Sequence, residues 1–315
     1  MGKFYLGRVS YNGRNYHGWQ KQKDLPTVQE TLFNTIRSIY EFGRIDVKAT
    51  SRTDSGVHAF SQVVKMLIPR RVDAPEMQKL LNDALPSDIY IHQLERINKS
   101  FKVTHLSQFK EYLYFFSLKK QSGMPFVGHL ESERAISLEL MKECARHYIG
   151  LHHFEAFQYK SDTSGGFKRK ILDSRITAAH EIFPQCFNAS SEVYCFHIKG
   201  EGFLKQMVRI LFGTMVKVGS GELSLQELSE WLKPPLERNS EILPDTTNRP
   251  GFIAPASGLF LYHIQYPELR IGEETRRLVD EKNFLNLFPE MELWKNTGES
   301  ETQDQSCSFP IEVRS

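Results

Sequence analysis

Apolar residues recur at regular spacings through the first hundred residues, and the spacing changes from stretch to stretch. A period of two over 45–49 and the apolar, β-branched run 61–68 predict two strands. Spacings of three and four residues predict helices over 28–40 and 74–84. Two further apolar stretches predict strands at 4–11 and 89–94. The predicted order is therefore strand, helix, strand, strand, helix, strand.

Side chains typical of helix ends mark where these helices start and stop. Thr27 and Glu30 predict a capping box, in which each side chain accepts a hydrogen bond from the other residue's backbone N–H. Ser224 and Glu227 predict a second capping box late in the chain. Pro86 ends the helix over 74–84, because the residue before a proline is disfavoured in the α conformation.

A similar order of elements follows residue 106. The predicted strands there run through 112–118, near 170–183, over 192–199 and over 259–266, and helices start near 137 and at Gly202. The order in the first half is that of the split ferredoxin-like unit. We therefore expect an α+β fold of two ferredoxin-like halves, 1–105 and 106–266. Their antiparallel sheets are expected side by side, with helices on one face and an active-site cleft between the halves.

Charge is distributed unevenly along the 315 residues, although the formal net charge is only +2. Residues 1–220 hold 31 Lys and Arg against 21 Asp and Glu, whereas residues 221–315 hold 9 against 17. This asymmetry favours a basic body that faces a polyanion. The acidic, polar composition from 267 to 315 predicts an appended tail.

The sequence also limits the class of protein. Its four cysteines contain no C-x-x-C pair, so neither a zinc site nor a disulfide framework is indicated. The first residues lack the pattern of a signal peptide, and no apolar run approaches the roughly 20 residues of a spanning helix. We expect a soluble, cytoplasmic protein.

The run from Ser51 to Ala59, Ser-Arg-Thr-Asp-Ser-Gly-Val-His-Ala, places a carboxylate, a guanidinium and a glycine between two predicted strands. Asp54 is therefore expected on a tight connection that is open to a ligand. Asp-Ser-Gly is also ordinary turn chemistry, so a plain hairpin turn is the alternative interpretation.

This nine-residue run resembles the signature of the tRNA pseudouridine synthase A family, and further blocks of that family occur in the same order. These blocks are Tyr16–Gln20, Leu81–Ile89, Lys110–Tyr114, Met207–Arg209 and Ala256–Leu259. Two departures stand out. Phe101-Lys102-Val103-Thr104 lacks the arginine of the family's F-x-A-R, and Gly150-Leu151-His152-His153-Phe154 replaces the common Gly-x-x-Asp-Phe.

The resemblance implies that uridine in tRNA is isomerised to pseudouridine without a cofactor. The C1′–N1 bond is cleaved, and the base is rejoined through C5 after it has been flipped out of its stack. Asp54 is implied as the catalytic nucleophile, with Arg209 as its partner. An unperturbed aspartate has a pKa near 3.9, and a nearby arginine is expected to lower that pKa by about 1–3 units.

The resemblance also implies three substrate contacts. Tyr112 is expected against the target base and Leu259 as an apolar wall on its other side, while Arg52 helps to displace the flipped nucleotide. Helical spacing places Lys205 four residues before Arg209, which predicts a cationic stripe on one helix. Further candidate contacts to RNA phosphates are Lys65, Arg70, Arg71, Lys168, Arg169, Lys170 and Lys205.

Two other interpretations remain open at this point. His147, His152 and His153 could be ligands of a metal-dependent hydrolase, although their spacing matches no known metal motif. The chain could also be an RNA-binding protein of the same fold without activity. A homodimer is implied by the bacterial family and is not visible in the sequence.

Overall fold

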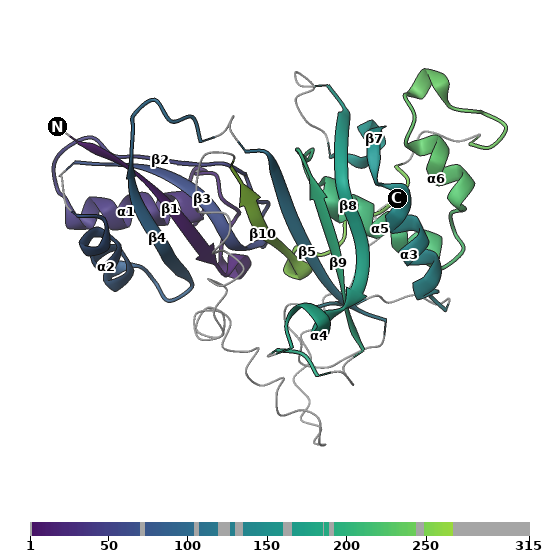
Figure 1. Cartoon of the computed structure of the whole chain (residues 1–315), viewed down its shortest axis with the longest axis horizontal. Helices are drawn as coiled ribbons and strands as arrows, with labels where there is room; N and C mark the ends of the chain where they lie inside the picture. Colours follow the sequence, from purple (N-terminus) through teal and green to yellow (C-terminus); the bar gives the residue numbers. More distant parts are fainter. Residues whose placement is uncertain are drawn as a thin grey trace.

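The N-terminal half is an antiparallel sheet covered by two helices, as Figure 1 shows. Its strands lie in the order β4-β1-β3-β2, and each neighbouring pair is antiparallel. This is the arrangement of a ferredoxin-like unit, so the predicted order of elements is confirmed for this half. The elements are β1 (Lys3–Tyr11), α1 (Val28–Ile39), β2 (Asp46–Ala49), β3 (His58–Ile68), α2 (Ala74–Ala84) and β4 (Ile89–Ile97).

The computed structural model describes most of the chain up to residue 266, in the ranges 2–69, 73–103, 107–118, 127–129, 135–159, 166–184, 186–188, 192–243 and 249–266. The predicted tail at 267–315 and the candidate contacts Arg70 and Arg71 lie outside these ranges. The predicted boundary near residue 105 also falls outside them and stays a prediction.

The C-terminal half repeats the same strand order. Strands β10-β5-β9-β8 are neighbours and antiparallel, and β7 pairs with β8 at the edge. The strands are β5 (Phe109–Ser117), β6 (Gly128–His129), β7 (Gly150–His153), β8 (Lys168–Ala178), β9 (Val193–Gly200) and β10 (Leu259–Gln265). The helices are α3 (Leu138–His147), α4 (Ala179–Ile182), α5 (Met207–Gly219) and α6 (Leu225–Trp231).

Strand β10 joins the two halves into one ten-stranded sheet (Figure 1). It pairs antiparallel with β5 and parallel with the first residues of β3, where Phe260 lies opposite His58. The start of β3 follows the Asp54 turn directly, and the start of β10 is Leu259. The topology therefore brings the Asp54 turn and Leu259 to the same junction.

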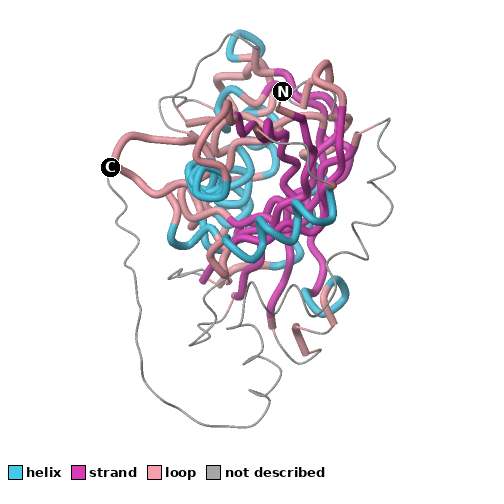
Figure 2. The backbone as a smooth tube through the Cα atoms, turned by 90° about the vertical axis from the view of Figure 1, so that its left-hand side faces the viewer, coloured by secondary structure: helices cyan, strands magenta, loops and turns pink. Residues whose placement is uncertain are grey.

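Each face of the sheet has its own apolar core, because alternate residues of a strand point to opposite faces. Tyr112, Tyr114 and Phe116 belong to the core that also contains residues of α1, α2, α3, α5 and α6. Leu113 and Phe115 belong to the other core, which holds Ala179 of α4. Figure 2 shows most helices on one side of the strands. The short helix α4 is the departure from the expected single helical face.

Three local predictions differ from the structure. The predicted strand near 170–183 ends at Ala178, and α4 follows it. The helix expected from Gly202 begins only at Met207, because Gln206 has a φ of 59°, which a right-handed helix cannot contain. The capping box predicted at Thr27 and Glu30 is only half formed. The Thr27 hydroxyl accepts from the backbone N–H of Glu30 at 3.4 Å, but the Glu30 carboxylate pairs with Lys21 at 2.9 Å.

Other local features agree with expectation. The capping box of Ser224 and Glu227 is formed, with both hydrogen bonds present. Cys144, Cys186 and Cys195 are buried thiols. Within the described ranges, every helix is too short or too polar to cross a membrane.

Candidate active site

Asp54 lies on a tight turn between β2 and β3, as the sequence predicts. The turn is closed by the backbone N–H of Val57, which donates to the Asp54 carbonyl oxygen at 3.1 Å. Gly56 has a φ of 76°, a conformation that glycine adopts without steric cost. The Asp54 side chain is half-buried, while the neighbouring Arg52 is exposed. The turn thus presents one carboxylate at the junction of the two halves.

The segment after β1 holds this turn in place. The N–H of Trp19 donates to the Thr53 carbonyl oxygen at 3.1 Å, and the N–H of Gly56 donates to the Tyr16 carbonyl oxygen at 3.1 Å. Gly18 has a φ of 86°, and a Cβ atom there would lie 2.5 Å from the Thr53 carbonyl oxygen. Only glycine permits this contact, so the Tyr16–Gln20 block is a backbone support for Asp54. Sequence reasoning found the block and gave it no role.

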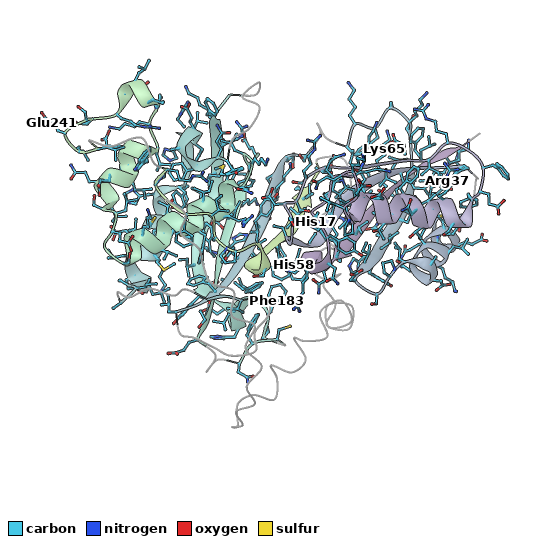
Figure 3. All side chains as sticks on the ribbon, turned by 180° about the vertical axis from the view of Figure 1, so that it is seen from behind. His17, Arg37, His58, Lys65, Phe183 and Glu241 are labelled. Atoms are coloured by element: carbon cyan, nitrogen blue, oxygen red, sulfur yellow. The ribbon has the colours of Figure 1, made fainter. Side chains whose placement is uncertain are left out.

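His58 links the same turn to the C-terminal half, and Figure 3 shows it near the centre of the molecule. Its Nδ1 accepts from the N–H of Gly13 at 3.0 Å, and it forms a hydrogen bond with the backbone of Ser257. Its ring stacks on Phe260 with centroids 4.6 Å apart. Burial lowers the pKa of His58 to about 3, so the ring is neutral. The histidine of the nine-residue run is therefore structural, a role that its sequence position did not reveal.

Tyr112 lies beside the start of the Asp54 turn. Its hydroxyl is 3.1 Å from the Ser51 Oγ, and its ring meets Phe203 edge-on with centroids 5.1 Å apart. Burial raises the pKa of Tyr112 to about 12, and the charge of Asp54 acts in the same direction. Asp54 and Tyr112 are therefore electrostatic neighbours.

Leu259 is placed at the junction by the close packing of Gly258. A Cβ atom on Gly258 would lie 2.8 Å from the Phe115 carbonyl oxygen and 2.9 Å from Cζ of Tyr114. The Tyr114 hydroxyl donates to the Pro255 carbonyl oxygen at 3.0 Å and so anchors the preceding turn. Tyr114 is thus a core residue.

Arg209 stands in the first turn of α5. Its Nε donates to the Ala254 carbonyl oxygen at 2.5 Å, and the Ala254 N–H donates back to the Arg209 carbonyl oxygen at 3.3 Å. The segment around Phe252 can lie along α5 because Gly213 has no side chain; a Cβ there would be 2.1 Å from the Phe252 carbonyl oxygen. Two backbone segments therefore set the direction of the guanidinium.

Burial decides the protonation equilibrium of Asp54. It raises the pKa of Asp54 above its ordinary value of 3.8, whereas Arg209 and, less strongly, Lys205 lower it. The arginine acts in the expected direction, but the predicted net lowering of the pKa is wrong, because the desolvation of the carboxylate outweighs both cations. Among the described residues, no ion pair within 4.0 Å joins Asp54 to either cation.

Lys205 and Arg209 do not form the predicted helical stripe, since Lys205 precedes α5. Lys65 donates to the carbonyl oxygens of Lys99 and Phe101, and Figure 3 shows it on the N-terminal half. The remaining candidates, Lys168, Arg169 and Lys170, lie on β8, where Lys170 is 3.8 Å from Glu201. The contact of each of these residues with RNA stays a prediction.

Two of the three histidines of the metal interpretation, His152 and His153, make local contacts. His152 Nε2 lies 2.9 Å from the Ile149 carbonyl oxygen, and His153 Nδ1 lies 3.8 Å from Glu155. Within the part of the chain that the structure describes, no group of three or more His, Cys, Asp or Glu side chains is placed to hold a metal ion. The described residues instead offer a half-buried carboxylate beside two cations and a tyrosine, which suits nucleophilic chemistry on an electron-poor carbon.

Comparison with known proteins agrees with this arrangement. A family model described as tRNA pseudouridine synthase matches residues 8–104 and 144–267. The chain is 30% identical over 260 residues to tRNA pseudouridine synthase A of Acetivibrio thermocellus, covering 82% of this chain and 97% of the relative. It is 32% identical over 264 residues to the protein of that name in Methylacidiphilum infernorum, covering 82% of this chain and 94% of the relative. Asp54 and Arg209 lie in the two matched segments.

Proposed function

Because this chain belongs to the tRNA pseudouridine synthase family, a family of isomerases, we propose that it converts uridine to pseudouridine in tRNA. The observation that carries the proposal is the position of Asp54. Its carboxylate is fixed on a braced turn, half-buried, and within electrostatic reach of Arg209, Lys205 and Tyr112. Such a group can act on a ribosyl carbon of a nucleotide that has left its stack.

In the proposed reaction, the Asp54 carboxylate attacks C1′, and an ester bond forms as the C1′–N1 bond breaks. The uracil turns and C5 attacks C1′, so that the C1′–C5 bond forms as the ester bond to Asp54 breaks. The proton on C5 leaves and N1 gains a proton, so that the product has the same composition as the substrate. No oxidant or reductant is consumed, and the protein has to supply only a nucleophile, a proton path and a closed pocket.

Four residues complete the proposed pocket. Tyr112 and Leu259 lie on opposite sides of the uracil, and stacking on an aromatic ring contributes about 1–3 kcal/mol per base. Arg209 balances the charge of Asp54. The exposed Arg52 occupies the space that the flipped nucleotide leaves, which offsets part of the few kcal/mol that flipping costs.

The two halves, 1–105 and 106–266, contribute different parts of this proposed site. Asp54 and Arg52 come from the first half, and the other three residues come from the second. We propose that the tRNA lies along the junction between the halves and that the protein works in the cytoplasm. A homodimer, implied by the family resemblance, stays a prediction that light scattering of the purified chain can test.

The proposed activity can be measured with tRNA transcripts labelled with tritium at C5 of uridine. Formation of the C5–C1′ bond expels the C5 hydrogen, so we expect release of tritium into water and pseudouridine in the nuclease digest. Binding of tRNA without either product would instead favour the interpretation as an inactive RNA-binding protein. A fair test uses tRNA from cells that lack this protein, because its target uridine is then unmodified.

The pH dependence of the reaction follows from the raised pKa of Asp54. Only the ionised carboxylate is a nucleophile, so kcat/KM should fall as the pH decreases through that pKa. Because burial raises the pKa, the acid limb should lie above the ordinary value of 3.8. Initial rates across a pH series with subsaturating tRNA give the profile. An acid limb at or below 3.8 would contradict the assignment of Asp54.

A further inference from the structure

Three segments that are far apart in the sequence meet at the ring of Tyr159. The N–H of Tyr159 donates to the Lys205 carbonyl oxygen at 3.1 Å. Each of two cations lies over the Tyr159 ring: Lys205 Nζ is 5.6 Å from the ring centroid, and Cζ of Arg249 is 5.3 Å from it. One aromatic side chain therefore holds two cations through its negatively polarised π system.

These two cations have no acidic partner among the described residues. No ion pair within 4.0 Å joins Lys205 or Arg249 to a carboxylate there, whereas exposed Lys79 and Asp83 form such a pair at 2.6 Å. Two like charges that share one ring repel each other. An anion between them would turn that repulsion into two attractions.

The group lies near the candidate active site. Lys205 is close enough to Asp54 to oppose the rise in the pKa of that carboxyl. Arg249 belongs to the same segment as Ala254, whose carbonyl oxygen accepts from Arg209. Lys205 is exposed, and Tyr159 and Arg249 are half-buried, so a ligand can reach the charges. The cations thus lie beside the site without being part of the Asp54 turn.

We propose that Tyr159, Lys205 and Arg249 form a phosphate clamp that holds a backbone phosphate of the RNA next to the target uridine. The proposal rests on the proposed function, because that function makes RNA the ligand. Lys205 and Arg249 bind the phosphate, and Tyr159 is a positioning residue. The ring is occupied by the two cations, so it serves them and does not stack on a base.

Salt dependence of binding tests the clamp, because each phosphate contact that is lost reduces the slope of log Kd against log salt. We expect Lys205→Met and Arg249→Met each to reduce that slope by about 0.7 to 0.9, and the double variant to reduce it by about twice as much. Fluorescence anisotropy of a labelled tRNA transcript, measured in the Asp54→Asn background, gives Kd without turnover. Lys79→Met is the matched control, because it removes an exposed charge that is already paired.

Two substitutions separate the ring from its hydroxyl. Tyr159→Phe keeps the π face and should keep the salt slope. Tyr159→Leu should reduce that slope by about 0.7 to 0.9, the value for one phosphate contact. In the Asp54 enzyme, Tyr159→Leu should raise KM several-fold and leave kcat at saturating tRNA unchanged. A structural role alone would lower the melting temperature and not move the salt slope.

The clamp would be overturned if Lys205→Met and Arg249→Met had the same salt slope as the Lys79→Met control. It would also be overturned if Tyr159→Phe and Tyr159→Leu reduced the salt slope equally. Failure of the proposed function has a different signature. If the protein forms no pseudouridine but the slopes fall as expected, the reaction assignment is wrong and the clamp stands. If pseudouridine forms and the slopes do not change, only the clamp is wrong.

Discussion

Asp54→Asn should abolish pseudouridine formation, with a loss of about 10³-fold or more, and should leave the affinity for tRNA nearly unchanged. The amide has almost the same shape as the carboxylate but is not a nucleophile, so the effect falls on kcat rather than on binding. Single-turnover assays with excess protein measure the chemical step directly. Anisotropy with the same tRNA measures the affinity.

The same variant should be more stable than the parent protein at neutral pH. Burial raises the pKa of Asp54, so the folded state holds a proton there more tightly than the unfolded state does. Stability therefore decreases as the pH rises through the raised pKa, and the ionised carboxylate is a cost that the amide does not carry. Melting curves at a series of pH values should show a higher melting temperature for Asp54→Asn than for the parent protein, and this difference should disappear toward low pH.

Asp46→Asn is a suitable control, because Asp46 lies on the neighbouring β2 and pairs at 3.1 Å with exposed Lys48. It should leave the turnover unchanged. Product formation by Asp54→Asn at a tenth of the normal rate or more would remove Asp54 from the mechanism. Loss of activity together with loss of tRNA binding would assign Asp54 to substrate recognition instead.

The order of strands and helices could be predicted from the sequence because the periodicities that define it are local. The parallel pairing of β3 with β10 could not, since His58 and Phe260 are about two hundred residues apart and no local pattern connects them. The junction that this pairing creates is also what brings Leu259 to the Asp54 turn. The family resemblance supplied the candidate residues, and the topology shows how two halves can share them.

The sign of the pKa shift of Asp54 illustrates a second limit. The family resemblance implied a cation near Asp54, and Arg209 does act on it, but burial depends on the whole fold and has the larger effect. The predicted start of the helix at Gly202 was also wrong, because Gln206 adopts a left-handed conformation that its residue type does not indicate. The supporting role of Gly18 had a signal, since a glycine between His17 and Trp19 in an otherwise bulky block is unusual.

Gly18→Ala should reduce kcat by about 10²-fold, although Gly18 is not proposed to touch the substrate. Its φ of 86° strains any other residue by about 1–2 kcal/mol, and its Cβ would lie 2.5 Å from the Thr53 carbonyl oxygen. The turn must then move away, and displacement of a reacting group by about 1 Å costs about that factor in rate. Single-turnover rates and melting curves of the purified variant give both effects.

Gly221→Ala separates strain from displacement. Gly221 has a similar φ of 74°, and a Cβ there would meet nothing within 4 Å. It should therefore lose about 1–2 kcal/mol of stability to backbone strain, as much as the strain part of Gly18→Ala, with no change in kcat. Equal kcat values for the two variants would show that Gly18 contributes only to stability. A selective loss in Gly18→Ala would establish that the Tyr16–Gln20 block sets the position of Asp54, because the three atoms nearest to the added methyl group belong to the backbone of that turn.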